Sequence, residues 1–245
     1  MSVPEYLLLA TASVVAAAIA SIAGFGIGSI LTPTLSLWFD ARLAVAAISI
    51  PHVIGTGLRF LTLNAKADTS VMWSFGLASA AGGLSGALLG TVFESAWLLI
   101  LLAVLLLFVG LGEFIGYTRR LAFHGTAAWI AGALSGVLGG LVGNQGGLRS
   151  AALLGFHLER RTFVATATAI ALFVDAARMP VYFYTHGEEL QQMATAIVVS
   201  SAGVVAGTLF GKRVLERIPE AIFRRVVAVL LIALGVALLW TTIRV

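Results

Sequence analysis

The sequence has no cysteine and few charged residues. Asp, Glu, Lys and Arg together make up 11% of its 245 residues. Without Cys the chain has no disulfide, no thiol nucleophile and no thiolate metal ligand. Because 60% of the residues are apolar, the chain has no room for a soluble domain. The composition therefore predicts a polytopic protein embedded in the lipid bilayer.

The few basic residues do not indicate a nucleic-acid partner. The net charge is only +4, and the basic residues lie in short breaks between apolar segments. Cytoplasmic flanks of membrane helices normally carry such residues. The first apolar segment follows no basic stretch and continues into further membrane sequence. We therefore expect it to belong to the fold and not to be a cleaved signal peptide.

Short polar breaks divide the chain into eight apolar segments. A membrane-spanning helix needs about 20 largely apolar residues, and nearly the whole length divides into segments of this kind. The breaks lie near residues 40–42, 64–68, 94, 118–120, 157–161, 186–189 and 212–220. We therefore predict an all-α polytopic membrane protein.

The two parts of the chain resemble each other at a shift of 119 residues. The shift aligns Gly24 with Gly143, Gly28 with Gly147, Arg42 with Arg161 and Arg59 with Arg178. The arginine matches carry weight because arginine is scarce here. Transporters are often built from weakly similar repeats. We therefore predict two repeats, residues 1–117 and 118–245.

The distribution of Lys and Arg indicates that the first segment of each repeat does not cross the membrane. If this segment enters, breaks at a glycine cluster and returns, nearly all loop Lys and Arg residues lie on one side. The positive-inside rule favours this arrangement over eight full crossings. The loops near Lys66, Arg119, Arg160 and Arg213 are then cytoplasmic. Each repeat becomes a re-entrant or broken helical hairpin plus three transmembrane helices, and this odd number makes the repeats inverted.

Two glycine clusters occupy equivalent places in the repeats. They read GFGIGSILTP from Gly24 to Pro33 and GNQGGLR from Gly143 to Arg149. Glycine releases the backbone from helical geometry, and a helix that restarts after a break points free N–H groups and its positive dipole end into the cavity. The alternative is that these glycines only permit close helix packing. We expect the hairpin tips to bind an anion through Gly26, Gly28, Ser29, Asn144, Gln145, Gly146, Gly147 and Arg149.

Four further polar residues lie within or near apolar spans, where polar residues by default suggest function. Arg59 and Arg178 are candidates for auxiliary charge in the site. Snorkelling to the interface is an alternative for both, and Arg178 can instead pair with Asp175 three residues earlier. His52 and Asp175 are candidates for proton coupling. For His52, a neutral ring bonded to a neighbouring helix is the alternative.

No metal, cofactor or enzymatic activity is expected. The remaining histidines show no metal-ligand spacing. The stretch GLSG from Gly83 to Gly86 fits the pattern of rhomboid proteases, whose serine needs a histidine on a later helix. The later histidines lie in predicted loops. With two more residues of shift between the repeats, Ser85 aligns with Ala206 in a small-residue packing motif.

This arrangement resembles the TauE/SafE sulfite exporter family, also called the toluene sulfonate uptake permease family. The resemblance covers essentially the whole chain and rests on two halves with paired glycine clusters. In the family each half reads roughly Gly-x-Gly-Gly-Gly followed by Pro. The first half keeps Gly24, Gly26, Gly28 and Pro33, with Ile27 and Ser29 in place of glycines. The second keeps Gly143, Gly146 and Gly147, with Gln145 in place of Gly and Ala152 in place of Pro.

The resemblance implies transport of sulfite, sulfonates or related small organic anions across the cytoplasmic membrane of a prokaryote. Together with the residues above, it predicts a secondary transporter, in the export direction, that alternates access between two repeats. A passive anion channel is one alternative. A membrane protein that transports nothing, with a structural polar cluster, is another. A homo-oligomer is compatible with the sequence.

Overall fold

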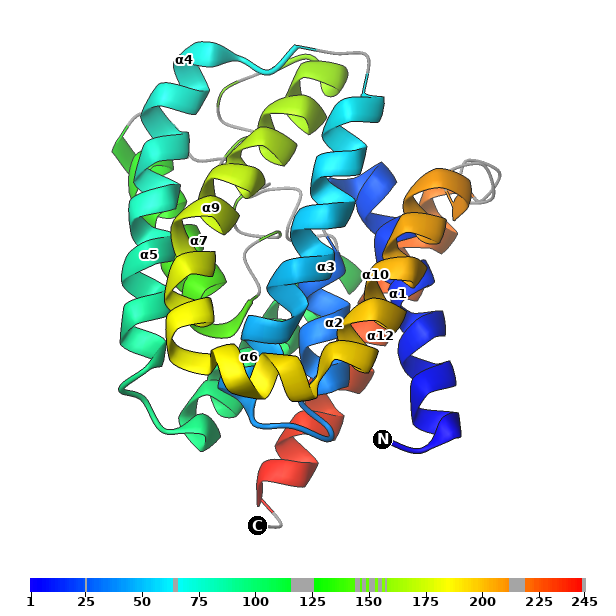
Figure 1. The fold of residues 1–245 in the computed structure, drawn as a ribbon. Coiled ribbons are helices and arrows are strands. Elements are labelled where there is room, and N and C mark those ends of the chain that lie inside the picture. The colour runs from blue at the N-terminus through cyan, green and yellow to red at the C-terminus, as the bar shows by residue number, and fades with distance from the viewer. Residues whose placement is uncertain are drawn as a thin grey trace.

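The chain folds into a bundle of helices (Figure 1). The structure is a computed structural model. It describes residues 1–24, 26–63, 66–115, 126–143, 146, 149, 153, 156, 158–211 and 219–243. These residues contain helices and no β-strand. The all-helical class predicted from the composition is confirmed.

The helices keep the order expected from the apolar segments. The first part of the chain contains α1 (Val3–Ala23), α2 (Ile27–Leu35), α3 (Ala41–Thr62), α4 (Thr69–Val71), the π-helical turn η1 (Met72–Gly76), α5 (Leu77–Gly90) and α6 (Ser95–Phe114). The second part contains α7 (Thr126–Val142), α9 (Arg160–Gln192), α10 (Ala194–Ala206), η3 (Gly207–Gly211) and α12 (Glu220–Ile243).

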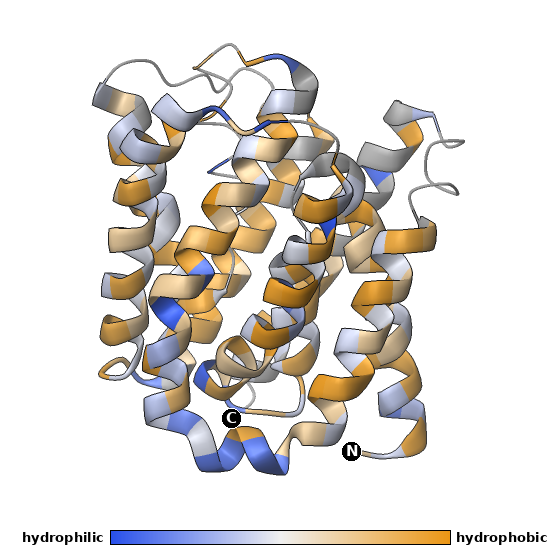
Figure 2. Cartoon of the chain, turned by 45° about the horizontal axis from the view of Figure 1, so that its top comes forward, coloured by the Kyte–Doolittle hydropathy of each residue, from blue (hydrophilic) through white to orange (hydrophobic). Residues whose placement is uncertain are grey.

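Four described helices are long and apolar enough to cross a membrane. They lie within residues 3–21, 41–62, 69–90 and 162–192. Four shorter apolar helices lie within residues 96–112, 129–142, 194–210 and 231–240. Figure 2 shows apolar residues over most of the length of the bundle, with hydrophilic residues concentrated towards its two ends. This is the pattern that a hydrocarbon surrounding requires.

The first apolar segment is a broken hairpin. α1 ends in a left-handed C-cap at Gly24, with φ of 78°, and Gly26 has φ of 142°. Residues with a Cβ rarely adopt these values, so two glycines allow the chain to reverse. α2 then packs back against α1. In Figure 1 both α1 and α3 begin at the lower end, so the segment returns to the end where it started.

The α5 helix packs lengthwise against α7, which belongs to the other predicted repeat. A Cβ added at Gly82 would lie 2.3 Å from the carbonyl oxygen of Ala133, and one at Gly86 would lie 2.1 Å from that of Val137. The GLSG stretch is therefore a face for close helix packing. Since both contact positions advance together along the chain, α5 and α7 run in the same direction.

The α1 helix packs in the same way against α10 and η3. A Cβ added at Gly203 would lie 2.7 Å from Cβ of Ser13, and one at Gly207 would lie 2.9 Å from Cβ of Ala17. These two helices also run in the same direction. The contacts of α1 and α7 therefore cross between the two parts of the chain, and the parts are interlaced.

Candidate functional site

A pocket lies where the break of the first hairpin faces the end of α7. Its lining combines five glycines with two arginines, a histidine and a serine. The lining residues are Ala20, Gly24, Gly26, Ile27, Gly28, Ser29, His52, Arg59, Gly143, Gly146 and Arg149. These residues come from the hairpin of α1 and α2, from α3 and from the segment after α7. Three stretches far apart in sequence therefore form one polar pocket inside an apolar bundle.

Most of the residues that the sequence nominates for the site lie together in this pocket. Gly26, Gly28, Ser29, Arg59, Gly146 and Arg149 line it, and so does His52. Arg178 and Asp175 are not among the lining residues, although Asp175 contacts His52. Asn144, Gln145 and Gly147 lie outside the described residues.

Arg149 is a buried charge without a described partner. Its side chain is 2% exposed, and neither Nε nor Nη1 has a hydrogen-bond partner among the described residues. Burying a guanidinium group in this way costs free energy unless something supplies the missing acceptors. Arg149 therefore has at least two donors that no described residue accepts from.

Arg59 holds the end of α1 from its position on α3. Its Nη1 donates to the carbonyl oxygen of Ala20 at 2.8 Å, and its Nε donates to Oγ1 of Thr168 on α9 at 3.1 Å. The carbonyl groups at the end of a helix carry partial negative charge, which favours a cation there, and the carbonyl oxygen of Ala20 also accepts from the backbone N–H of Gly24. Among the described residues Arg59 thus bonds to a carbonyl group and a hydroxyl group, and to no carboxylate.

Arg178 makes the corresponding contact at the end of α7, but its charge is compensated. Its Nη1 donates to the carbonyl oxygen of Gly139, which the 119-residue shift aligns with Ala20. Its Nε and Nη2 both donate to Oδ1 of Asp175, at 3.0 and 2.7 Å. Its guanidinium carbon also lies 5.8 Å from the ring centroid of Tyr182. The two arginines therefore share a backbone contact and differ in their ionic partners.

His52 connects the pocket to this ion pair. Its Nδ1 lies 2.7 Å from Oδ2 of Asp175, on the neighbouring helix α9. Asp175 is fully buried. One of its carboxylate oxygens contacts His52, and the other accepts from Arg178. The hydrogen bond to a neighbouring helix, which the sequence offered as one interpretation of His52, is present.

The profile of the sulfite exporter TauE/SafE family matches residues 9–238, nearly the whole chain. The chain belongs to this family. Searches of curated proteins and of solved structures gave no match. Membership in the TauE/SafE family confirms the resemblance found in the sequence. It makes the chain an integral membrane transporter of sulfite- and sulfonate-type anions, and members of the family are transporters and not enzymes.

The sequence reasoning missed two residues of this TauE/SafE protein that contact its buried arginines, Thr168 and Tyr182. Thr168 accepts from Arg59, and Oη of Tyr182 donates to the carbonyl oxygen of Gly140 at 2.5 Å. The helical spacing of Tyr182, four residues after Arg178, was an available signal. Thr168 gave none, because its contact joins helices distant in sequence.

Gly28 is where the first hairpin touches the end of α7. A Cβ added at Gly28 would lie 2.1 Å from the carbonyl oxygen of Gly143 and 3.3 Å from its carbonyl carbon. Both atoms belong to the backbone, so neither can rotate away. We expect Gly28→Ala to destabilise the protein by about 1–3 kcal/mol, the usual cost of overpacking. Thermal unfolding of the detergent-purified protein measures this effect.

Gly57→Ala on α3 is the matched control. A Cβ added there has no neighbour within 4 Å. Because Ala is the better helix former, we expect this variant to be unchanged or more stable by about 0.5–1 kcal/mol. Equal stability of the two variants would contradict the close contact at Gly28.

Proposed function

We propose that this chain is a secondary transporter that exports a small oxyanion of the sulfite or sulfonate class. The anion binds in the pocket between the hairpins. The observation that carries the proposal is Arg149, a buried guanidinium group with unused donors that lines this pocket. Guanidinium groups form strong, charge-assisted hydrogen bonds with oxyanions.

The start of α2 supports the same binding mode. α2 begins at Ile27, and its N-cap is Gly26, which has no side chain to cap the first N–H groups. A helix N-terminus of this kind attracts anions through its dipole and its N–H groups. Gly26, Ile27 and Gly28 all line the pocket with Arg149. The pocket therefore combines a helix terminus with a side-chain cation. We extend this site to Asn144, Gln145 and Gly147, which the sequence places at the second hairpin tip.

The two parts of the chain form inverted repeats in this proposal, residues 1–117 and 118–245. The support is that aligned residues have the same local structure. Gly24 and Gly143 both have positive φ, 78° and 69°, at the ends of α1 and α7. The helix pairs also correspond, because α1 runs parallel to α10 while α7, its counterpart, runs parallel to α5.

Alternating access would then expose the pocket to one side of the membrane at a time. Since α1 packs on α10 and α5 packs on α7, each moving unit contains helices from both repeats. The parts that rock against each other would then be these two mixed bundles, and not the first and second halves of the chain. The pocket lies where the repeats meet, as in other transporters with inverted repeats.

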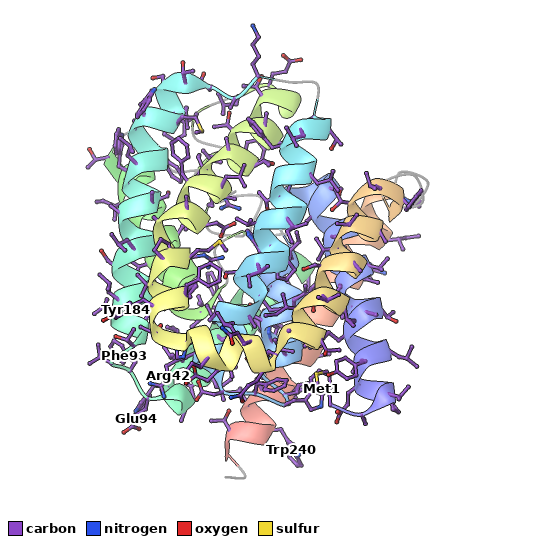
Figure 3. All side chains as sticks on the ribbon, in the orientation of Figure 1. Met1, Arg42, Phe93, Glu94, Tyr184 and Trp240 are labelled. Carbon is purple, nitrogen blue, oxygen red and sulfur yellow. The ribbon has the colours of Figure 1, made fainter. Side chains whose placement is uncertain are left out.

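The cytoplasmic side is proposed to be the upper end in Figure 1. α3 ends and α9 begins there, next to Lys66 and Arg160. The opposite end carries Glu94 together with Arg42 (Figure 3). The positive-inside rule then assigns the loops near Lys66, Arg119, Arg160 and Arg213 to the cytoplasm.

A proton is the coupling ion that the site favours. His52 lines the pocket and bonds Asp175. Protonation of its ring would therefore act both on the bound anion and on the ion pair with Arg178. Histidine is the side chain whose charge changes most readily near neutral pH.

Flux of labelled sulfite in vesicles containing the purified protein tests this function. We expect flux that saturates with sulfite concentration and that a pH gradient drives to accumulation. Flux that neither saturates nor responds to the gradient would favour a channel. Absence of flux for sulfite and small sulfonates would favour a structural role for the polar cluster.

A further inference from the structure

The buried charges of the protein do not balance. Among the described residues the buried ionic side chains are Arg59, Arg149, Arg178 and Asp175, with exposed fractions between 0 and 5%. Three are arginines and one is an acid. Within this part of the bundle, two positive charges therefore have no acid to oppose them.

The single acid is committed to one of the arginines. Oδ1 of Asp175 accepts from Nε and Nη2 of Arg178, and its Oδ2 lies 2.7 Å from His52. Arg178 and Asp175 therefore neutralise each other away from the pocket lining. Arg59 and Arg149 have no carboxylate partner among the described residues, although the charge of Asp175 still acts on both from a distance, and both of these side chains line the pocket.

The chain around the pocket supplies no other acid. Residues 143–157 contain no Asp or Glu, and neither do residues 21–39, so both hairpin tips lack carboxylates by sequence. His52, the remaining titratable group in the lining, carries no negative charge in either protonation state. No acid is therefore among the described lining residues, so a bound anion would supply the negative charge nearest to Arg59 and Arg149.

We propose that the pocket selects doubly charged oxyanions over singly charged oxyanions of the same shape. This inference rests on the proposed function and names the charge class of its substrate. A dianion compensates both Arg59 and Arg149, whereas a monoanion leaves one buried guanidinium group without a counter-charge. Uncompensated buried charge is costly because the interior screens it far less than water does. Several oxygens on one central atom also suit the planar donor fork of each arginine.

Two pairs of anions isolate the charge from the shape. Methanesulfinate is sulfite with one oxygen replaced by a methyl group, and it carries one charge instead of two. Methanesulfonate stands in the same relation to sulfate. Each anion is tested as a competitor of labelled sulfite flux, and by the thermal stabilisation that it gives the purified protein. The pH is kept alkaline so that sulfite stays doubly charged. Where the dianion of a pair binds, we expect it to bind at least about tenfold more tightly than the monoanion of that pair. This ratio corresponds to a difference of about 1.4 kcal/mol in the free energy of binding.

Arg59→Gln tests whether the two charges act together. This variant keeps an N–H donor for the carbonyl group of Ala20 and removes one positive charge. We expect the ratio of sulfite affinity to methanesulfinate affinity to fall about tenfold, towards one. Lys66→Gln removes a positive charge from an exposed loop and is expected to leave the ratio unchanged. A purely structural role of Arg59 would weaken both anions equally, and that result would overturn the assignment.

The outcomes separate this inference from the transport function. Saturable sulfite flux with equal affinity for sulfite and methanesulfinate would overturn the preference for dianions and leave the function standing. Absence of both sulfite flux and stabilisation by sulfite would overturn both.

Discussion

Arg149→Met is expected to lose saturable sulfite flux while keeping the stability of the folded protein. Arg149 has at least two donors without described partners, and each charge-assisted hydrogen bond to a ligand contributes about 1.5–3 kcal/mol. Their loss predicts sulfite affinity weaker by about a hundredfold or more. Stability is expected to be retained or to rise, because methionine fills similar space without burying a charge. Flux into vesicles and thermal unfolding are measured on the same preparation.

Arg149→Lys is the companion variant. Lysine keeps the charge but loses the planar fork of donors. We expect weak residual flux, between those of the wild type and of Arg149→Met. Normal flux in Arg149→Met would remove this residue from the substrate site. A large loss of stability in the same variant would instead assign Arg149 a role in holding the fold.

Asp175→Asn is expected to destabilise the protein by about 3–5 kcal/mol, the cost of breaking a buried ion pair from one side. The substitution keeps the shape of the side chain and removes the charge that faces Arg178 and His52. Adding Arg178→Met should recover a large part of this loss, because the uncompensated charge is then removed as well. Unfolding in detergent micelles measures the wild type, both single variants and the double variant.

Asp40→Asn provides the comparison at an exposed position. Asp40 is the N-cap of α3, where its side chain accepts from the backbone N–H of Arg42. Asparagine caps helices about as well as aspartate, and the exposed ion pair with Arg42 contributes at most about 1 kcal/mol. Equal losses of stability in Asp40→Asn and Asp175→Asn would contradict the prediction that breaking the buried ion pair of Asp175 strongly destabilises the protein.

Part of this site was accessible from the sequence because it depends on local constraints. Positive φ values favour glycine, so Gly24 and Gly143, which the 119-residue shift aligns, could be singled out from the sequence. Arginine inside apolar sequence is costly, so Arg59, Arg149 and Arg178 stand out as well. The spacing of Asp175 and Arg178 already suggested an ion pair, and the structure contains it.

The rest depends on contacts that leave no local pattern. His52 and Asp175 are 123 residues apart and meet only because α3 and α9 pack together. The small residues of α5 indicated a close helix contact, but did not identify α7 as the partner. The sequence suggested the partner of Arg178, but the contacts of Arg59 with Thr168 and with the carbonyl group of Ala20 join distant segments and left no local pattern.

The interlacing of α1 with α10 also sets the order in which the protein can assemble. Chains are synthesised from the N-terminus, so α1 enters the bilayer long before residues 194–211 exist. Until then, the surface of α1 that packs against Gly203 and Gly207 in the folded protein has no such contact. α5 likewise lacks its packing partner until α7 is synthesised, but for a shorter time. The bundle therefore closes late in biosynthesis, and a chain that terminates before α10 leaves its very first helix without its main packing partner.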